Sequence, residues 1–296
     1  MTNSRRNFIR NTAFAAAGVM VAKPNLFAAA KPKNIIGVQL YSVRADMKAN
    51  PIATLEQLAK IGYKHVEHAF YANRKFYGYS ATEFKKILDG FGLQMPSGHS
   101  MLEIKHWDAA KKDFTDEWKY TVEDAAAVGQ MFVISPSMET NTRRDLNALK
   151  AFMEVFNKSG ELCQKYGMKF GYHNHDFEFE EFGDTNGYEI LLNETDPNLV
   201  DFELDLYWAV RAGHNPLDLF KQHPGRFTMW HVKDMDKANK EFNAEIGKGA
   251  IDFKAIFAQA KQSGMKRFFL EHETNYSPNP GESIKTSFDY ISKNLI

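Results

Sequence analysis

The stretch DFELDLYW, residues 201–208, alternates three carboxylates with apolar side chains. Because side chains on a β-strand point alternately to opposite faces, Asp201, Glu203 and Asp205 share one face and the apolar residues between them share the other. In a parallel barrel the apolar row packs against the surrounding helices, which leaves the carboxylates facing the barrel interior. Buried carboxylates are costly unless protonation, a lysine or a cation neutralises them. The stretch therefore predicts a barrel strand and a polar or metal-binding interior.

Short apolar and β-branched runs alternate with segments of helical periodicity eight times along the chain. Eight such repeats predict one α/β domain, a TIM (β/α)8 barrel over residues 31–296. An open doubly wound sheet is the main alternative, but no GxGxxG motif follows the first predicted strand. The predicted strands are residues 35–43, 65–70, 94–100, 131–137, 169–177, 200–206, 227–234 and 267–273. The predicted helices are residues 51–61, 82–91, 114–128, 143–166, 187–194, 216–223, 252–263 and 282–293.

Ionisable side chains stand near the C-terminal ends of predicted strands five to eight. They are His173 and His175, Asp205, His231 and Lys233, and Glu271 and Glu273. Taken singly, each is explained as a packed or salt-bridged residue, but their coincidence on four strands favours a metal site. Neutral imidazole and carboxylate ligands predict one divalent cation, with Mn, Zn, Co, Fe and Mg as the alternatives.

Polar and aromatic residues near other predicted strand ends are candidates to bind the hydroxyl groups and ring faces of a sugar. The substrate-binding candidates are Gln39, Tyr41, Glu67, His99, Trp208 and Glu273. For the aromatic rings the alternative role is ordinary packing. Together these residues predict a polar pocket for a small carbohydrate.

The charge balance argues against a nucleic-acid partner. Lysine plus arginine and aspartate plus glutamate both total 37, so the formal net charge is +0 and no basic surplus exists to neutralise a phosphate backbone. The single cysteine, Cys163, excludes an intrachain disulfide and is predicted to be a small core residue. The oligomeric state stays open, with a homo-oligomer among the alternatives.

The first thirty residues carry the parts of an export signal. SRRNFIR, residues 4–10, contains a twin arginine, a weakly apolar run follows over residues 12–22, and small residues stand at 28–30. We therefore expect residues 1–30 to be a twin-arginine-type (Tat) signal peptide and the protein to be periplasmic or otherwise exported, the alternative being a basic amphipathic helix. Because the apolar run is shorter than the about 20 residues of a transmembrane helix, no stable membrane span is expected after cleavage.

At these motifs the chain resembles the xylose isomerase-like TIM-barrel family, which contains sugar phosphate isomerases and epimerases and an inosose dehydratase-like branch. The resemblance runs through residues 37–44 (GVQLYSVR), 173–179 (HNHDFEF), 203–208 (ELDLYW), 231–235 (HVKDM), 247–253 (GKGAIDF) and 270–273 (LEHE). Family members bind one divalent cation, usually with Glu, Asp, His and Glu from strands five to eight. The resemblance implies that Asp205, His231 and Glu271 are ligands, and that His173 stands in place of the first glutamate.

The exchange of that glutamate for His173 bears on the reaction. In the family's epimerases the two glutamates pass one proton between the faces of the substrate, next to the metal. Here Glu271 is one candidate acid or base, and His175, Glu178 and Glu273 are alternatives for the other.

Lys233 is a further catalytic candidate, as a contact to a substrate oxygen. Its alternative role is a salt bridge to Asp201 or Glu203.

The leading functional hypothesis is a metal-dependent isomerase or epimerase that abstracts a proton α to the carbonyl of a keto sugar. The second is a lyase, of the inosose dehydratase kind or one that cleaves a 3-keto-glycoside. A non-catalytic periplasmic sugar-binding protein is the third, and an endonuclease is a poor fourth because the chain lacks a basic excess. Without a glycine-rich phosphate cradle, an unphosphorylated sugar is the expected substrate.

Overall fold

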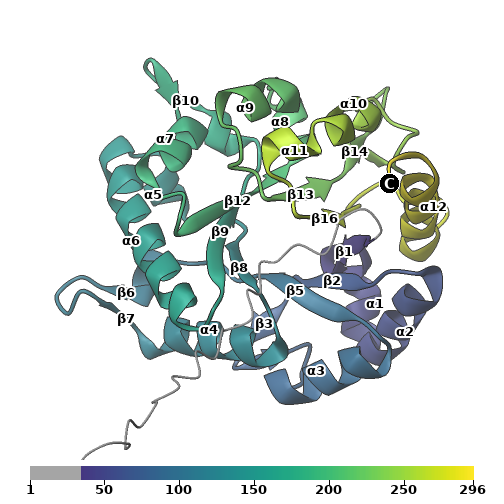
Figure 1. Ribbon diagram of the computed structural model, residues 1–296, viewed down its shortest axis with the longest axis horizontal. Coiled ribbons are helices and arrows are strands. Elements are labelled where there is room, and N and C mark those ends of the chain that lie inside the picture. Colours follow the sequence, from purple (N-terminus) through teal and green to yellow (C-terminus); the bar gives the residue numbers. More distant parts are fainter. Residues whose placement is uncertain (1–34) are drawn as a thin grey trace, which may run out of the picture. The chain divides into compact units, whose positions relative to one another are not determined.

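The computed structural model describes residues 35–296, and a closed barrel of eight parallel strands forms its centre (Figure 1). The strands follow the order β1-β2-β5-β8-β9-β12-β13-β16, and β16 pairs with β1. The predicted TIM barrel is confirmed. The signal predicted on residues 1–30 lies outside the described residues and stays a prediction. The barrel strands are β1 (Gly37–Gln39), β2 (His65–His68), β5 (Gln94–His99), β8 (Phe132–Ser135), β9 (Lys169–His173), β12 (Val200–Asp205), β13 (Met229–Val232) and β16 (Arg267–Leu270).

Each barrel strand ends earlier than predicted, because the polar residues at the C-terminal ends leave the sheet and enter the loops above it. Four of these loops carry a two-stranded antiparallel hairpin. The hairpins follow β2, β5, β9 and β13, so they stand at the end of the barrel where TIM-barrel enzymes build their sites. They are β3 (Tyr71–Ala72) with β4 (Lys75–Phe76), β6 (Trp107–Asp108) with β7 (Asp113–Phe114), β10 (Glu181–Phe182) with β11 (Thr185–Asn186), and β14 (Asp234–Met235) with β15 (Asn243–Ala244).

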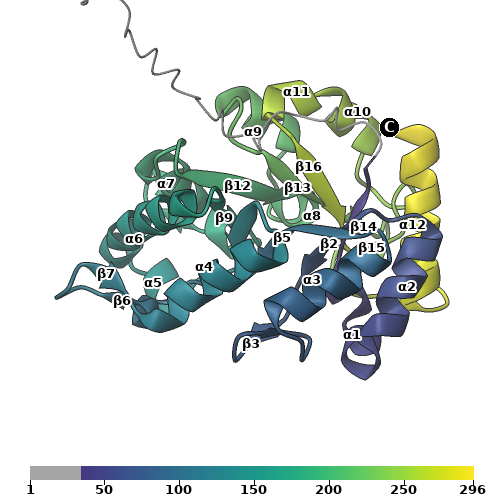
Figure 2. The same ribbon diagram turned by 60° about the horizontal axis from the view of Figure 1, so that its bottom comes forward.

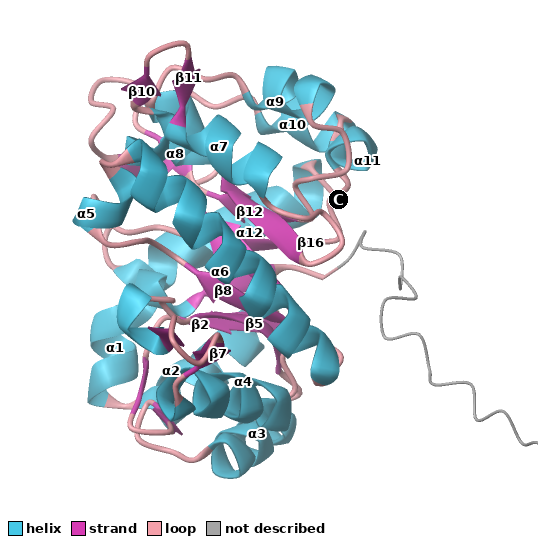
Figure 3. Cartoon of the chain, turned by 90° about the vertical axis from the view of Figure 1, so that its left-hand side faces the viewer, coloured by secondary structure: helices cyan, strands magenta, loops and turns pink. Residues whose placement is uncertain are grey.

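Helices surround the strands, as Figure 3 shows. α2 and α7 begin and end at the predicted residues, whereas the helix predicted over 252–263 is divided at Gln259. Within residues 35–296 no helix combines the length and apolar character that crossing a membrane requires. The helices are α1 (Arg44–Ala49), α2 (Pro51–Ile61), α3 (Ala81–Gly90), α4 (Asp116–Val128), α5 (Thr140–Arg143), α6 (Leu146–Lys165), α7 (Gly187–Glu194), α8 (Leu206–Arg211), α9 (Pro216–Gln222), α10 (Phe253–Ala258), α11 (Ala260–Ser263) and α12 (Pro280–Asn294).

The main hydrophobic core lies between the barrel and its helices. Phe202 and Leu204 of β12 belong to it, and so does Cys163 of α6, which confirms the buried position predicted for the cysteine. Burial raises the pKa of the Cys163 thiol to about 12. The apolar row of β12 therefore belongs to the core around the barrel, as predicted.

The first and last strands of the barrel, β1 and β16, pair with each other, and α12 packs close to the beginning of the chain. Tyr63, directly after α2, packs edge-on against Phe288 of α12 and donates a hydrogen bond of 2.9 Å to the Ile284 carbonyl. Figure 2 shows α12 (yellow) next to α2 (purple) at this seam. The last helix thus ties the end of the barrel chain to its beginning.

Inside the barrel, the carboxylate row of β12 meets different partners at different depths. Asp201, nearest the N-terminal end of the strand, lies 2.9 Å from Lys169 Nζ and accepts a hydrogen bond from the Thr228 hydroxyl. Lys169 thus neutralises the lowest carboxylate of the row, and Glu203 and Asp205 lie nearer the mouth of the barrel.

A small buried apolar cluster of Phe132, Ile134 and Met229 is separate from the main core.

The contact between α6 and the loop before β12 leaves no space for a side chain at Gly160. A Cβ there would lie 2.6 Å from the Leu199 carbonyl oxygen. We expect Gly160→Ala to lower the free energy of unfolding by roughly 1–3 kcal/mol, because overpacking outweighs the better helix propensity of alanine. Gly90→Ala, at the end of α3 with nothing within 4 Å of the new Cβ, is the control and should cost no stability. Urea denaturation measures both; wild-type stability in Gly160→Ala would contradict the packing.

Candidate metal centre and pocket

His231 of β13 lies at the centre of the polar barrel interior, and its two ring nitrogens face different layers. Nε2 is 2.7 Å from Glu67 Oε2, while Nδ1 is 3.2 Å from Glu271 Oε2. A hydrogen bond from Nε2–H to Glu67 leaves the Nδ1 lone pair directed toward Glu271 and Asp205. This carboxylate–histidine pair orients the imidazole as a ligand.

Asp205 ends β12 with one oxygen used and one free of hydrogen bonds. Oδ1 accepts a hydrogen bond of 2.9 Å from the backbone N–H of Trp208, which caps α8, and Asn174 accepts one from the Asp205 N–H. Oδ2 is buried and has no hydrogen-bond partner among the described residues. It lies 3.9 Å from His231 Nδ1, and burial raises the pKa of Asp205 to about 6. A buried oxygen of this kind needs a cation or a proton.

His173 of β9 lies on the other side of Asp205. Its Nε2 is 3.9 Å from Asp205 Oδ2, and its Nδ1 is 3.3 Å from Glu203 Oε2. His173 thus repeats the arrangement of His231, with one nitrogen toward a supporting carboxylate and the other toward Asp205.

These side chains fit one divalent cation. Ligand atoms of Asp205, His231 and Glu271 lie within 4.8 Å of one another, and His173 Nε2 approaches the same aspartate oxygen. Two imidazoles and two carboxylates are a donor set that Mn, Zn, Co and Fe accept. The predicted ligands are therefore brought together.

Below the candidate ligands, a second group of histidines and a carboxylate could also hold a metal ion. His99, His173, Glu203 and His231 also place ligand atoms within 4.8 Å of one another. Here, however, the nitrogens already face carboxylates: His99 Nε2 lies 2.9 Å from Glu203, and the rings of His99 and His231 stack at 5.2 Å. We assign this layer to positioning the upper ligands, because its imidazole nitrogens face carboxylates: His231 Nε2 lies 2.7 Å from Glu67 and His173 Nδ1 lies 3.3 Å from Glu203.

Lys233 forms salt bridges, but with other carboxylates than the predicted Asp201 or Glu203. Its Nζ lies 3.3 Å from Glu271 Oε2 and 2.5 Å from Glu273 Oε1, rather than beside Asp201 or Glu203. The side chain is fully buried and does not line the pocket, because β13 directs it between the two glutamates of the neighbouring strand end. Lys233 therefore holds these two carboxylates in place.

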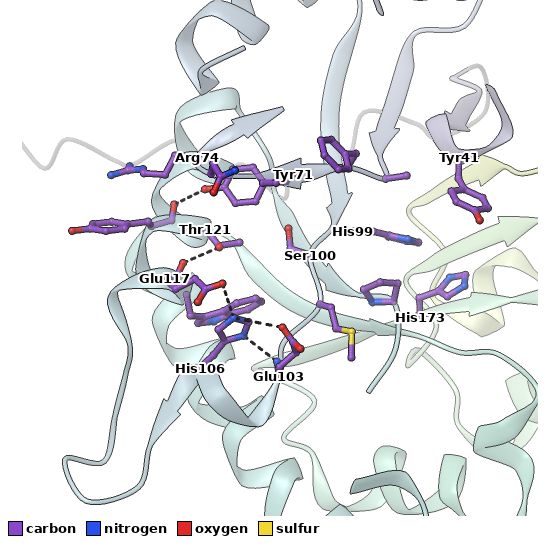
Figure 4. Close-up of a pocket in the computed structure, with 18 of the residues that line it drawn as sticks. Tyr41, Tyr71, Arg74, His99, Ser100, Glu103, His106, Glu117, Thr121 and His173 are labelled. Atoms are coloured by element: carbon purple, nitrogen blue, oxygen red, sulfur yellow. Dashed lines mark hydrogen bonds and ion pairs between the residues drawn. The ribbon is translucent and has the colours of Figure 1, made fainter. Parts of the chain in front are cut away.

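A pocket of about 800 Å³ opens over the metal centre (Figure 4). Of the predicted substrate-binding residues, Tyr41, His99 and Glu273 line it. Gln39 and Glu67 do not, because Gln39 Nε2 donates to Glu67 Oε2 and both side chains are completely buried below the mouth.

Two further predicted residues lie at the edges of this region. Trp208 is absent from the pocket lining; its ring packs against His175, with ring centroids 5.2 Å apart. His175 does line the pocket, although β9 already ends at His173. Its Nδ1 is buried and has no hydrogen-bond partner among the described residues. Burial and the nearby Lys233 lower the pKa of His175 to about 3, so the imidazole is neutral, the form that can accept a proton.

Glu178, a predicted candidate for the catalytic base, is not among the residues that line the pocket. Its Oε1 accepts a 2.5 Å hydrogen bond from the Tyr172 hydroxyl, and its Oε2 accepts one from the backbone N–H of His175. Both oxygens are thus occupied in fixing the turn after β9, because the chain leaves the strand there and its polar groups need partners.

Sequence reasoning missed two groups of residues. Glu203 was predicted only as an interior carboxylate, but it faces both His99 and His173 and so orients ligands. The wall formed by the β3–β4 hairpin and the start of α4, including Arg74 and Glu117, was also missed. No motif marks that wall, since its residues meet only through the fold.

Comparisons with known proteins agree with this architecture. The family model described as xylose isomerase-like TIM barrel matches residues 55–294. An inosose dehydratase from Clostridium beijerinckii is 25% identical over 268 residues, which cover 81% of this chain and 85% of that protein.

Solved structures give the same result. A sugar phosphate isomerase/epimerase from Parabacteroides distasonis is 28% identical with a TM-score of 0.76, covering 88% of this chain and 98% of that one. The IOLI protein with a binding zinc atom has a TM-score of 0.68 at 17% identity, covering 88% and 99% of the two chains, a likeness of fold alone.

The buried Glu178 makes stability depend on pH. Burial raises its pKa from 4.5 to about 8, so the folded chain keeps a proton that the unfolded chain releases. The stabilisation is complete below pH 4.5 and is lost as the pH rises to 8, a change of roughly 3–5 kcal/mol. In Glu178→Gln the amide nitrogen can donate to Tyr172 while its oxygen accepts from His175, as a protonated carboxyl would.

We therefore expect Glu178→Gln to gain stability relative to wild type between pH 5 and pH 9, measured by urea denaturation at each pH. The exposed neighbour Glu180 provides the control, and Glu180→Gln should keep the wild-type pH dependence. Parallel pH profiles for wild type and Glu178→Gln would show that this carboxyl is already ionised in the fold.

Proposed function

Because this chain belongs to the xylose isomerase-like TIM barrel family, we propose that it is a divalent-metal-dependent enzyme acting on a keto sugar. It removes a proton α to the carbonyl and then eliminates an oxygen leaving group. The observation that carries the proposal is Asp205 Oδ2, a buried oxygen without a hydrogen-bond partner between two imidazoles and beside Glu271.

The charges of the interior support a cation at this position. Glu67, Glu203, Asp205 and Glu271 are all buried, and Lys233 is the lysine that reaches the upper two. Burial alone would lower the pKa of His231, but the nearby carboxylates raise it, so a proton and a metal ion compete for this imidazole. A divalent cation held by His173, Asp205, His231 and Glu271 would act as a Lewis acid toward a substrate carbonyl.

The residues around the metal centre divide the remaining work. His175, which lines the pocket beside His173, accepts the proton from the substrate carbon. Glu273 also lines the pocket, and Lys233 fixes its carboxylate on the opposite strand end, where it can return a proton to the leaving oxygen. Elimination needs a base that takes the proton from the substrate carbon and an acid that gives one to the leaving oxygen. An imidazole and a carboxyl group can divide these two tasks.

Isomerisation or epimerisation is the second candidate. It shares the proton abstraction, and the sugar phosphate isomerase/epimerase from Parabacteroides distasonis, at 28% identity, favours it. We rank it below elimination because His173 replaces the glutamate that a two-carboxylate proton exchange needs, and because curated relatives such as the Clostridium beijerinckii protein are named dehydratases. A sugar-binding protein without catalysis would not explain the converging ligand set.

Metal content tests the centre directly. We expect about one equivalent of Mn, Zn, Co or Fe in the purified protein by elemental analysis, and none in Asp205→Ala. Glu67→Gln should weaken metal affinity by roughly 10–100-fold, because it removes the carboxylate that orients His231. Asp201→Asn, which changes a carboxylate of the same row paired with Lys169, should keep the metal. A protein that neither contains nor takes up these cations would refute the proposed centre.

Reaction in deuterated water separates elimination from epimerisation. With a keto sugar as substrate, we expect an α,β-unsaturated ketone to accumulate, detected by ultraviolet absorbance, and Glu271→Gln to lose the activity by 100-fold or more. Deuterium incorporated at one carbon of an otherwise intact sugar would instead establish isomerisation or epimerisation.

A further inference from the structure

The pocket continues beyond the metal centre into a second compartment, which we call the outer arm. Its walls are Tyr71, Arg74, Glu103, His106, Glu117 and Tyr120. Figure 4 shows Arg74 and Tyr71 across the cavity from Glu103 and His106, while His99 and His173 lie at the other end of the pocket, with Ser100 between. None of these arm residues takes part in the proposed proton transfers.

One wall of the outer arm is held rigidly. Arg74 and Asn73 turn the β3–β4 hairpin with positive φ angles of 60° and 51°, a conformation that costs free energy in residues with side chains. The Arg74 guanidinium compensates by binding Asp124 of α4 through two hydrogen bonds of 2.7 and 3.0 Å, and Tyr71 donates a third, of 2.6 Å, to the same carboxylate. The hairpin is thereby fixed to α4, so the cavity is already formed.

The opposite wall is polar and equally well supported. His106 stacks on the buried Trp118, and its Nδ1 accepts a hydrogen bond from the Glu103 N–H. Glu117 stands in the first turn of α4, largely exposed, with Oε1 3.5 Å from His106 Nε2. Carboxylate and imidazole groups therefore face the cavity from the side opposite the aromatic hairpin.

This combination of groups matches a ring that carries hydroxyl groups. Carboxylates accept hydrogen bonds from hydroxyls. The exposed ring of Phe70 and the face of the Tyr120 ring that Arg74 does not cover offer apolar surface to the C–H face of a sugar. A phosphate is disfavoured, because Asp124 already neutralises Arg74 and a single lysine, Lys105, is shared by Glu103 at 2.8 Å and Glu117 at 3.6 Å. Carboxylates therefore outnumber cations among these residues. The arm therefore selects a neutral, hydroxyl-rich group.

We propose that the outer arm is a second sugar subsite, and that the substrate is a keto sugar joined to another sugar ring, as in an oxidised disaccharide. The cavity of about 800 Å³ has room for two rings, since pockets for drug-sized ligands span roughly 300–1,000 Å³. This inference rests on the proposed function for the ring at the metal centre.

The second ring is then the leaving group of the elimination. The C–H bond next to the carbonyl breaks, and its electron pair forms a C=C bond as the C–O bond to the second ring breaks. The proton goes to the base, and the oxygen of the departing sugar takes up a proton from the acid, so an unsaturated keto sugar and a free sugar result. No oxidant is needed, because the substrate already carries the ketone.

The test compares one-ring and two-ring substrates. We would measure kcat/KM of the metal-loaded protein for 3-ketoglucose and for a panel of 3-keto glucose disaccharides of different linkage. We expect at least one disaccharide to be preferred, and Glu117→Ala and Tyr120→Ala to lower the ratio of its kcat/KM to that of 3-ketoglucose about tenfold. Glu154→Ala, an exposed glutamate on α6, is the matched control and should leave the ratio unchanged. An unchanged ratio in both arm variants, or no preferred disaccharide, would overturn the subsite.

A binding measurement distinguishes failure of the subsite from failure of the proposed function. If no keto sugar is turned over, calorimetry with glucose, the glucose disaccharides and phenyl glucoside still reports on the arm. Tighter binding of a disaccharide than of glucose, lost in Glu117→Ala, would support the subsite without the reaction. Equal binding, no binding of any, or tight phenyl glucoside binding that Glu117→Ala leaves intact would refute a sugar in the arm.

Discussion

The burial of four carboxylates inside one barrel is the constraint on which the rest of the site depends. Glu67, Glu203, Asp205 and Glu271 are each at most 5% exposed, and like charges at this spacing cannot all remain ionised without compensation. The barrel interior meets this constraint with imidazoles placed between carboxylates and with Lys233 between Glu271 and Glu273. Next to Asp205 Oδ2, between two imidazoles and beside Glu271, a divalent cation would complete the balance.

Strands and loops contribute differently to the site. The candidate ligands stand at or next to the ends of barrel strands, where the hydrogen-bonded sheet fixes their spacing. The carboxylates that orient the two imidazoles lie one layer deeper, Glu67 on β2 and Glu203 on β12. The pocket walls come instead from hairpins and helix starts. The ion pair between Arg74 and Asp124 gives one of these walls a fixed shape, although it is built from a loop.

The separation between these parts has a consequence for specificity. In the proposed reaction, a metal centre on strands would perform the same proton abstraction on many keto sugars, whereas the proposed subsite in the outer arm would select among them by the group attached to the reacting ring. Phosphate selection requires positive charge that the arm does not offer, because its cations already pair with carboxylates.

Much of the fold was predictable from the sequence, because the period-two alternation of residues 201–206 and the eight repeats of strand and helix are local signals. The same alternation, with the family resemblance, brought His173, Asp205, His231 and Glu271 together as expected ligands. Residue type alone did not give the contacts of two predicted catalytic residues. Glu178 accepts hydrogen bonds that fix a turn, and Lys233 pairs with two glutamates. Which nitrogen of His231 faces Glu67, and which residues wall the outer arm, was decided only by the tertiary structure. These relations join side chains up to 164 residues apart, and no local pattern records the contact between them.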